Sequence, residues 1–98
     1  MRFEFDSQKS ARNERERGFP FAAAGRLFES IRFEWEDRRK DYGETRFNAL
    51  GEIESRVFCV SFTRRGEAIR IISFRKANAR ETRRCGDYLR ERSTRREN

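Results

Sequence analysis

The feature that most constrains this sequence is a series of four apolar segments joined by short, charged connections. These segments are 31–36, 45–51, 56–63 and 68–74. In the first, Ile31, Phe33 and Trp35 alternate with charged residues, which is the period of a half-buried strand. The connections, including the turn "RRGE", are too short for crossover helices. We therefore expect an antiparallel meander of four strands.

Helical patterns lie on both sides of these strands in the chain. Residues 7–17 are polar, can be capped by Asp6 or Ser7, and stop at Gly18. Residues 19–31 place Phe21, Ala24 and Phe28 on one face of a second helix. A basic helix over 77–92 is expected to begin near Ala77 or Asn78, and Gly86 can break it.

The elements together predict an α+β domain. Its two N-terminal helices and its C-terminal helix would surround a four-stranded antiparallel sheet, and "RFEF" (2–5) can add a short first strand. At 98 residues there is apolar material for one core, which we assign to residues 1–92, with 93–98 as a frayed basic tail. Charged residues make up 42% of the chain, but ten Phe and a Trp are too many for a solvated coil.

The charge balance points to an anionic partner. The formal net charge is +7, and nearly all of the cations are arginines. The planar guanidinium pairs bidentately with phosphate, so an arginine-rich surface suits RNA, DNA or an acidic protein. A GC-rich genome can also produce the bias toward arginine, but it does not account for the net charge.

Several classes of protein are disfavoured. Cys59 and Cys85 have no CxxC spacing and the chain has no histidine, so neither a zinc site nor another metal or cofactor site is expected. The two thiols are expected to be free in a reducing cytoplasm. No apolar stretch approaches the ~20 residues of a membrane span, and the N-terminus lacks a signal-peptide core. We expect a soluble cytoplasmic protein.

RNA cleavage by internal transfer is one chemistry that such a chain could perform. It requires stabilisation of charge on the pentavalent phosphate, which cations on or beside the predicted sheet can supply. These cations are Arg46, Arg64, Arg65, Arg70, Arg75 and Lys76. It also requires proton transfer, and an arginine stays protonated near neutral pH. The titratable groups nearest the cations in the sequence are Lys40, Asp41, Tyr42 and Glu44.

Each of these residues also has a purely structural interpretation. Arg70 can lie on a solvated sheet face. Ser73 is two residues after Ile71 and would point to the same side of a regular strand, so it can fill space in the core. Glu44 and Arg46 can form a surface ion pair worth under ~1 kcal/mol. Trp35, Phe58 and Phe62 can be core residues rather than platforms for bases, and the segment 79–85 can be an exposed basic helix. No spacing among these residues is the signature of a reaction.

Three blocks of the sequence together resemble the BrnT family, the toxins of bacterial type II toxin–antitoxin pairs, whose fold is similar to that of RelE-type ribonucleases. The first block matches at Asp6, Lys9, Asn13 and Gly18, and the second at Gly43, Glu44, Arg46 and Gly51. The third and most specific matches at Thr63, Arg64, Gly66, Arg70, Ser73, Arg75, Lys76, Ala77 and Glu81. The resemblance extends from Phe3 to about Cys85.

The chain departs from the family pattern at three positions. Glu16-Arg17 stands where members commonly carry Lys-His, Lys40 where a His is frequent, and Cys85 where an aromatic residue is usual. Both imidazoles are thus replaced by cations, so positive charge is kept while a proton-transfer group is lost.

The resemblance implies an mRNA-cleaving enzyme that needs no metal. A BrnA-like antitoxin would neutralise it, and the complex would bind operator DNA through the antitoxin. We assign catalytic roles to Glu44, Arg46, Arg64, Arg70, Arg75 and Lys76, and RNA binding to Lys40, Tyr42, Arg65, Ser73 and Arg80. Two alternatives remain: a catalytically weakened toxin that binds antitoxin or nucleic acid without cleaving, and a DNA-binding module that uses the helix 77–92.

Overall fold

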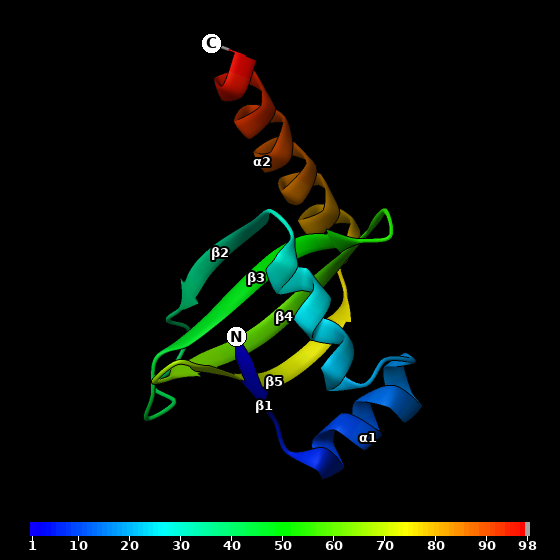
Figure 1. Cartoon of the computed structure of the whole chain (residues 1–98), viewed down its shortest axis with the longest axis vertical. Helices are drawn as coiled ribbons and strands as arrows, with labels where there is room; N and C mark the ends of the chain where they lie inside the picture. The colour runs from blue at the N-terminus through cyan, green and yellow to red at the C-terminus, as the bar shows by residue number, and fades with distance from the viewer. Residues whose placement is uncertain (98) are drawn as a thin grey trace.

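A computed structural model describes the backbone of residues 1–97 and the side chains of residues 1–92. Five strands form one sheet in the order β1-β5-β4-β3-β2 (Figure 1). The strands are β1 (Arg2–Glu4), β2 (Arg32–Asp37), β3 (Arg46–Ile53), β4 (Arg56–Arg65) and β5 (Ala68–Lys76). Strands β2 to β5 form the predicted antiparallel meander.

The predicted four-stranded, wholly antiparallel sheet is wrong at one edge. Strand β1 pairs with β5 in parallel, with Phe3 opposite Ile69, so the sheet is five-stranded and mixed. Phe3 packs against Phe28 with ring centres 5.5 Å apart, and it also joins the main core cluster. The packing of Phe3 therefore reinforces the backbone pairing that attaches this short strand to the sheet edge.

Helix α1 (Ser7–Arg17) lies on one side of the sheet and is tied to it by polar contacts. Asp6 caps the helix by accepting from the backbone nitrogens of Gln8 and Lys9, and Gly18 ends it at φ 89°. The buried amide of Asn13 donates to the carbonyl oxygens of Phe19 and Phe74, each at 2.8 Å. A helix whose only apolar residue is Ala11 is thereby fixed to β5.

The second predicted helix is a 3₁₀ helix, η1 (Phe21–Glu29), rather than an α-helix. Residues three apart eclipse one another in this conformation. Phe21, Ala24 and Leu27 therefore line up against the sheet, each at most 3% exposed. Phe28 adds an edge contact with Phe62 at 5.0 Å between ring centres. The core lies between η1 and this face of β3, β4 and β5.

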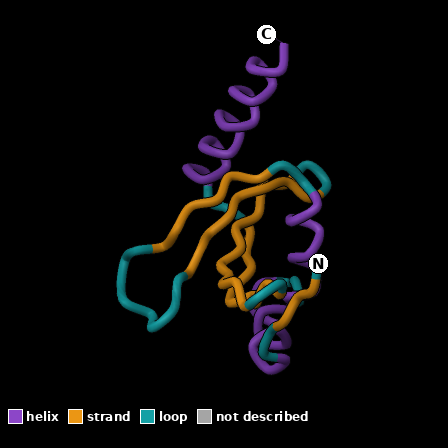
Figure 2. The backbone as a smooth tube through the Cα atoms, turned by 60° about the vertical axis from the view of Figure 1, so that its left-hand side comes forward, coloured by secondary structure: helices purple, strands orange, loops and turns teal. Residues whose placement is uncertain are grey.

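Helix α2 (Ala79–Glu97) begins on the opposite face of the sheet and then extends away from the rest of the molecule (Figure 2). Asn78 and Glu81 form a capping box: Glu81 N–H donates to Asn78 Oδ1 at 2.8 Å, and Asn78 N–H donates to Glu81 Oε1 at 3.0 Å. Cys85 and Leu89 pack in a second cluster with Leu50 and other residues of that face. Gly86 does not break the helix.

The predicted end of the domain at residue 92 falls inside α2, which continues to Glu97. The side chains of the predicted tail, 93–98, and the whole of Asn98 lie outside the described residues. The division into a domain and a frayed tail therefore stays a prediction.

A β-bulge between β4 and β5 changes which residues of β5 face each side. Ser61 pairs with Ser73, whereas the next residue of β4, Phe62, pairs with Ile71, so Ile72 is an extra residue in β5. As a result Ile71 and Phe74 both face the core, and Ser73 faces the opposite side. The interpretation of Ser73 as core filler, which rested on strict alternation, is wrong for this reason.

Candidate functional site

The sheet face opposite α1 and η1, here called the open face, carries a row of side chains that runs across four strands. Trp35 pairs with Asn48, Asn48 with Ser61, and Ser61 with Ser73. Paired residues of neighbouring strands point to the same side of a sheet, so these four side chains lie next to one another. Ser61 Oγ donates to Asn48 Oδ1 at 2.6 Å. We call these four side chains the polar row; at one end of it, Trp35 packs against the apolar cluster under α2.

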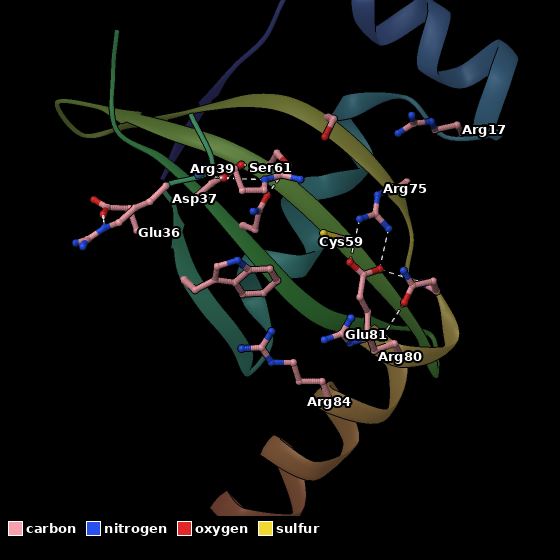
Figure 3. Close-up of a pocket in the computed structure, with 15 residues that line it drawn as sticks. Arg17, Glu36, Asp37, Arg39, Cys59, Ser61, Arg75, Arg80, Glu81 and Arg84 are labelled. Carbon is pink, nitrogen blue, oxygen red and sulfur yellow. Dashed lines mark hydrogen bonds and ion pairs between the residues drawn. The ribbon is translucent and has the colours of Figure 1, made fainter. Parts of the chain in front are cut away.

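A cleft of about 790 Å³ lies over this row, and we call it the open-face cleft (Figure 3). Its walls come from the end of α1, from β2 and the loop after it, from β3, β4 and β5, and from the first turns of α2. The lining residues are Arg17, Trp35, Glu36, Asp37, Arg38, Arg39, Asn48, Cys59, Ser61, Ser73, Arg75, Asn78, Arg80, Glu81 and Arg84. Six arginines against three acidic residues make the cleft electropositive.

Two ion pairs in the cleft hold elements of the fold together. Arg75 donates to both carboxylate oxygens of Glu81, at 2.8 and 2.9 Å, and so joins β5 to the first turn of α2. These bonds from Arg75, helped by the backbone N–H of Asn78 and opposed by burial, lower the pKa of Glu81. Arg39 likewise donates to both oxygens of the buried Asp37, at 2.9 and 2.8 Å, and holds the pKa of Asp37 well below its usual range. Neither carboxylate is suited to accept a proton near neutral pH.

Three other arginines of the cleft are free of such pairing. Within residues 1–92, Arg17, Arg80 and Arg84 form no ion pair with an acidic side chain. Arg17 reaches toward the open face from the end of α1, while Arg80 and Arg84 come from α2 (Figure 3). Cations on two separate walls can therefore contact one anion, or successive anions of a polymer, placed in the cleft.

The thiol in the cleft is chemically inert. Burial raises the pKa of Cys59 to about 11, so the thiol stays protonated at neutral pH. Cys85 is also buried, and both cysteines are free, as predicted.

A second, smaller cavity lies toward the β4–β5 turn, and we call it the turn-side cavity. It is lined by Asp6, Lys9, Tyr42, Glu44, Arg46, Arg65, Arg70, Ile71 and Ile72. Glu44 lies 3.5 Å from both Arg46 Nε and Arg65 Nη2. Arg46 stacks on the Tyr42 ring at 4.2 Å, and among the described residues its buried Nε has no hydrogen-bond acceptor. Tyr42 OH donates to Asp37 at 3.1 Å, which connects this cavity to the open-face cleft.

The predicted site residues thus lie in four different places. Ser73, Arg75 and Arg80 line the open-face cleft, and Tyr42, Glu44, Arg46, Arg65 and Arg70 line the turn-side cavity. Lys40 is exposed, with its ammonium 5.2 Å from the centre of the Tyr42 ring. Arg64 and Lys76 face the core side of the sheet instead, where Arg64 covers Phe47 and pairs with Glu34, and Lys76 covers Phe19.

Several cleft residues were not among the predicted site residues. Arg17, Arg39 and Arg84 are far apart in the sequence, and only the fold brings them to one cleft. For Arg17 a signal existed, because it occupies the position at which the resembled family commonly carries histidine. For Arg39 and Arg84 the sequence offered none, since arginines are abundant throughout the chain.

The comparison with protein families decides the identity. The model of the family described as "Ribonuclease toxin, BrnT, of type II toxin-antitoxin system" matches residues 5–81, more than half of the chain. The chain belongs to the BrnT family. No curated protein is significantly similar to it. The BrnT match spans α1, η1 and strands β2 to β5, and it ends at Glu81, in the first turn of α2.

Family membership gives the site its context. BrnT proteins are ribonuclease toxins of type II toxin–antitoxin systems, so RNA is the substrate and an antitoxin is the partner. All residues of the open-face cleft except Arg84 fall within the matched range. Within residues 1–97, no helix has both the length and the apolar character that crossing a membrane requires.

Proposed function

We propose that this BrnT protein is a metal-independent endoribonuclease that binds mRNA in the open-face cleft. The observation that carries the proposal is a set of three arginines, Arg17, Arg80 and Arg84, that have no acidic partner among residues 1–92 and surround a polar floor. A single strand of RNA presents one phosphate per nucleotide, and each guanidinium group can pair bidentately with a phosphate.

The proposed reaction is attack of a ribose 2′-hydroxyl on the adjacent phosphorus. The 2′-hydroxyl loses its proton, the bond to the 5′-oxygen of the next nucleotide breaks, and the departing oxygen takes a proton from solvent. The products are a 2′,3′-cyclic phosphate and a 5′-hydroxyl. Negative charge grows on the phosphate oxygens in the transition state, and the unpaired guanidinium groups supply the compensating charge that a metal ion supplies elsewhere. Arg75 assists, because only part of its five N–H donors are used by Glu81.

Proton transfer is assigned to the turn-side cavity. Glu44 is the proposed acceptor of the 2′-hydroxyl proton, from a ribose that reaches out of the open-face cleft into the turn-side cavity. Tyr42 lines that cavity and donates to Asp37 of the cleft, so the two sites are adjacent. Arg46, Arg65, Arg70 and Lys40 would bind the flanking phosphates of the RNA. Arg64 and Lys76 lie on the other face of the sheet, so they would contact only RNA that passes around the edge of the sheet.

The setting of the reaction follows from the family. A BrnA-like antitoxin would cover the cationic cleft, and the complex would bind operator DNA through the antitoxin. The expected RelE-like fold and a cytoplasmic, stress-related role belong to the same proposal. Neutralisation by an acidic or amphipathic segment is consistent with the electropositive lining of the cleft.

The test is cleavage of RNA by the purified protein in the presence of EDTA, with analysis of the product ends. We expect cleavage with 2′,3′-cyclic phosphate or 3′-phosphate ends. Activity should decrease strongly as salt rises, because the logarithm of the RNA-binding constant falls with the logarithm of the salt concentration by roughly 0.7 per phosphate contact. Activity only with added magnesium would contradict the metal-independent reaction.

One observation favours a second candidate function, a weakened toxin that binds without cleaving. The chain has no histidine, and Arg17 lines the cleft at a position where the resembled family carries an imidazole. Induced expression without antitoxin separates the two candidates. Growth arrest supports the enzyme, whereas normal growth together with salt-dependent RNA binding by the purified protein supports the binding module.

A further inference from the structure

One lining residue of the open-face cleft, Trp35, is aromatic rather than polar or charged, and the proposed reaction does not use it. Trp35 stands at the end of the polar row, and its ring centre lies 5.4 Å from that of Phe33. Arg84, from α2, places its guanidinium carbon 5.1 Å from the centre of the Trp35 ring and 4.6 Å from that of Phe33. Trp35 is only partly buried, and it lines the cleft.

We propose that Trp35 and Arg84 form a subsite that binds a nucleobase of the RNA next to the scissile phosphate. The proposal rests on the proposed function, because it names a further contact of the same substrate in the same cleft. The base would stack on the indole in the place that the Arg84 guanidinium now covers. Arg84, which has no acidic partner among residues 1–92, would turn to the adjacent phosphate.

The exchange is favourable for two reasons. Stacking of a base on an aromatic ring is stronger than the contact of an exposed guanidinium with the same ring. The displaced cation is not left unpaired either, because the base arrives with its own phosphate. Among the charged residues that line the cleft, Arg84 lies over the indole, and the lining as a whole carries six arginines against three acidic residues. The subsite therefore joins a flat apolar surface to a net positive rim.

This subsite would also affect sequence preference. Stacking tolerates every base but favours purines, whose larger rings cover more of the indole. We expect a purine at one position beside the cleavage site to be preferred over a pyrimidine, and this preference should be lost when the aromatic ring is removed.

Trp35 is the only tryptophan in the chain, so its fluorescence reports on this subsite alone. The probe is a ten-nucleotide 2′-O-methyl RNA with a fluorescent label at one end, which cannot be cleaved because the attacking hydroxyl is blocked. Its companion has the same backbone and phosphates but no bases. Anisotropy of the label measures binding, and tryptophan emission measures contact with the indole in the same titration.

We expect the base-bearing RNA to bind and to quench at least half of the Trp35 emission. The abasic companion should bind at least fivefold more weakly and leave the emission unchanged. Binding of both oligomers with equal affinity and unchanged emission would overturn the subsite while leaving the proposed function intact. Binding of neither oligomer would refute both.

Two variants add a structural control, measured by anisotropy. Trp35→Phe keeps an aromatic ring and should weaken binding by less than twofold, whereas Trp35→Leu keeps apolar volume without a ring and should weaken it at least fivefold. Equal affinities in the two variants would count against stacking. If Trp35→Leu does not fold, as shown by its melting curve, the abasic comparison in the natural protein decides the question.

Discussion

Arg75 illustrates how one residue can have two roles. It lines the open-face cleft, as a phosphate-binding residue would, and its two hydrogen bonds to Glu81 also hold β5 against the capped start of α2. Loss of Arg75 would therefore disturb folding and RNA binding together. Arg17 and Arg80, which lack such a partner among residues 1–92, separate the two effects better.

The buried carboxylate of Asp37 predicts a specific dependence of stability on pH. Its pKa is lowered in the folded state, chiefly by Arg39, whereas the unfolded chain has the ordinary value of 3.8. The unfolded state therefore binds the proton first as pH falls, so the stabilisation is complete above about pH 5 and decreases progressively as the pH falls below about 4. Asp37→Asn should melt at a lower temperature than the natural protein at pH 6, and this difference should shrink toward pH 3.

Thermal melting between pH 3 and pH 7 checks this. Asp87→Asn, at an exposed position of α2, is the control and should change little. A constant difference between Asp37→Asn and the natural protein over the whole range would show that the charge of Asp37 does not contribute.

Glu44 carries the prediction for proton transfer. Glu44→Gln keeps shape and hydrogen bonding but cannot accept a proton, so cleavage should fall by on the order of 100-fold and the acidic limb of the pH–rate curve should disappear. Glu67→Gln, in the exposed β4–β5 turn, is the matched control. If Glu44→Gln keeps its rate and its acidic limb, Glu44 is only an ion-pair partner of Arg46, and Tyr42, Lys40 or solvent must transfer the proton.

At the scale of elements, alternation and helical spacing predicted the meander and the three helical segments well. They failed where a β-bulge or a 3₁₀ helix changes the spacing of residues that face the same side. The extra residue Ile72 reverses the direction of Ser73, and the three-residue period of η1 replaces the expected α-helix. The attachment of β1 to β5 could not be predicted either, because a three-residue strand has too little pattern to define a partner.

The docking of α1 gives a prediction at this scale. Asn13→Ala would leave the carbonyl oxygens of Phe19 and Phe74 without the amide that bonds them. The cost of such unpaired buried groups is about 1–3 kcal/mol, so we expect a clear fall in melting temperature. Arg12→Ala, on the exposed side of the same helix, should stay within about 0.5 kcal/mol of the natural protein. Equal melting temperatures for the two variants would show that Asn13 does not fix α1.

At the scale of the whole molecule, the sequence predicted a cationic surface but not its location. Composition gave the net charge, and the resemblance gave the family and its substrate. Five of the eight predicted cations lie in the turn-side cavity or on the core side of the sheet. Arg17 and Arg84, by contrast, reach the open-face cleft from opposite ends of the chain. Such a convergence depends on how α1 and α2 are placed around the sheet, which no local pattern encodes.

The central claim is that RNA is cleaved in the open-face cleft, and Arg80 and Arg83 test it most directly. Both are exposed arginines in the first turns of α2, so either alanine variant changes the net charge equally, but only Arg80 lines the cleft. The measurement is the RNA cleavage rate of Arg80→Ala and Arg83→Ala at equal concentration and salt, with melting curves to show that both are folded. We predict that Arg80→Ala is at least tenfold slower than Arg83→Ala, which should match the natural protein. Equal rates for the two variants would contradict the claim and place the reaction elsewhere on the protein.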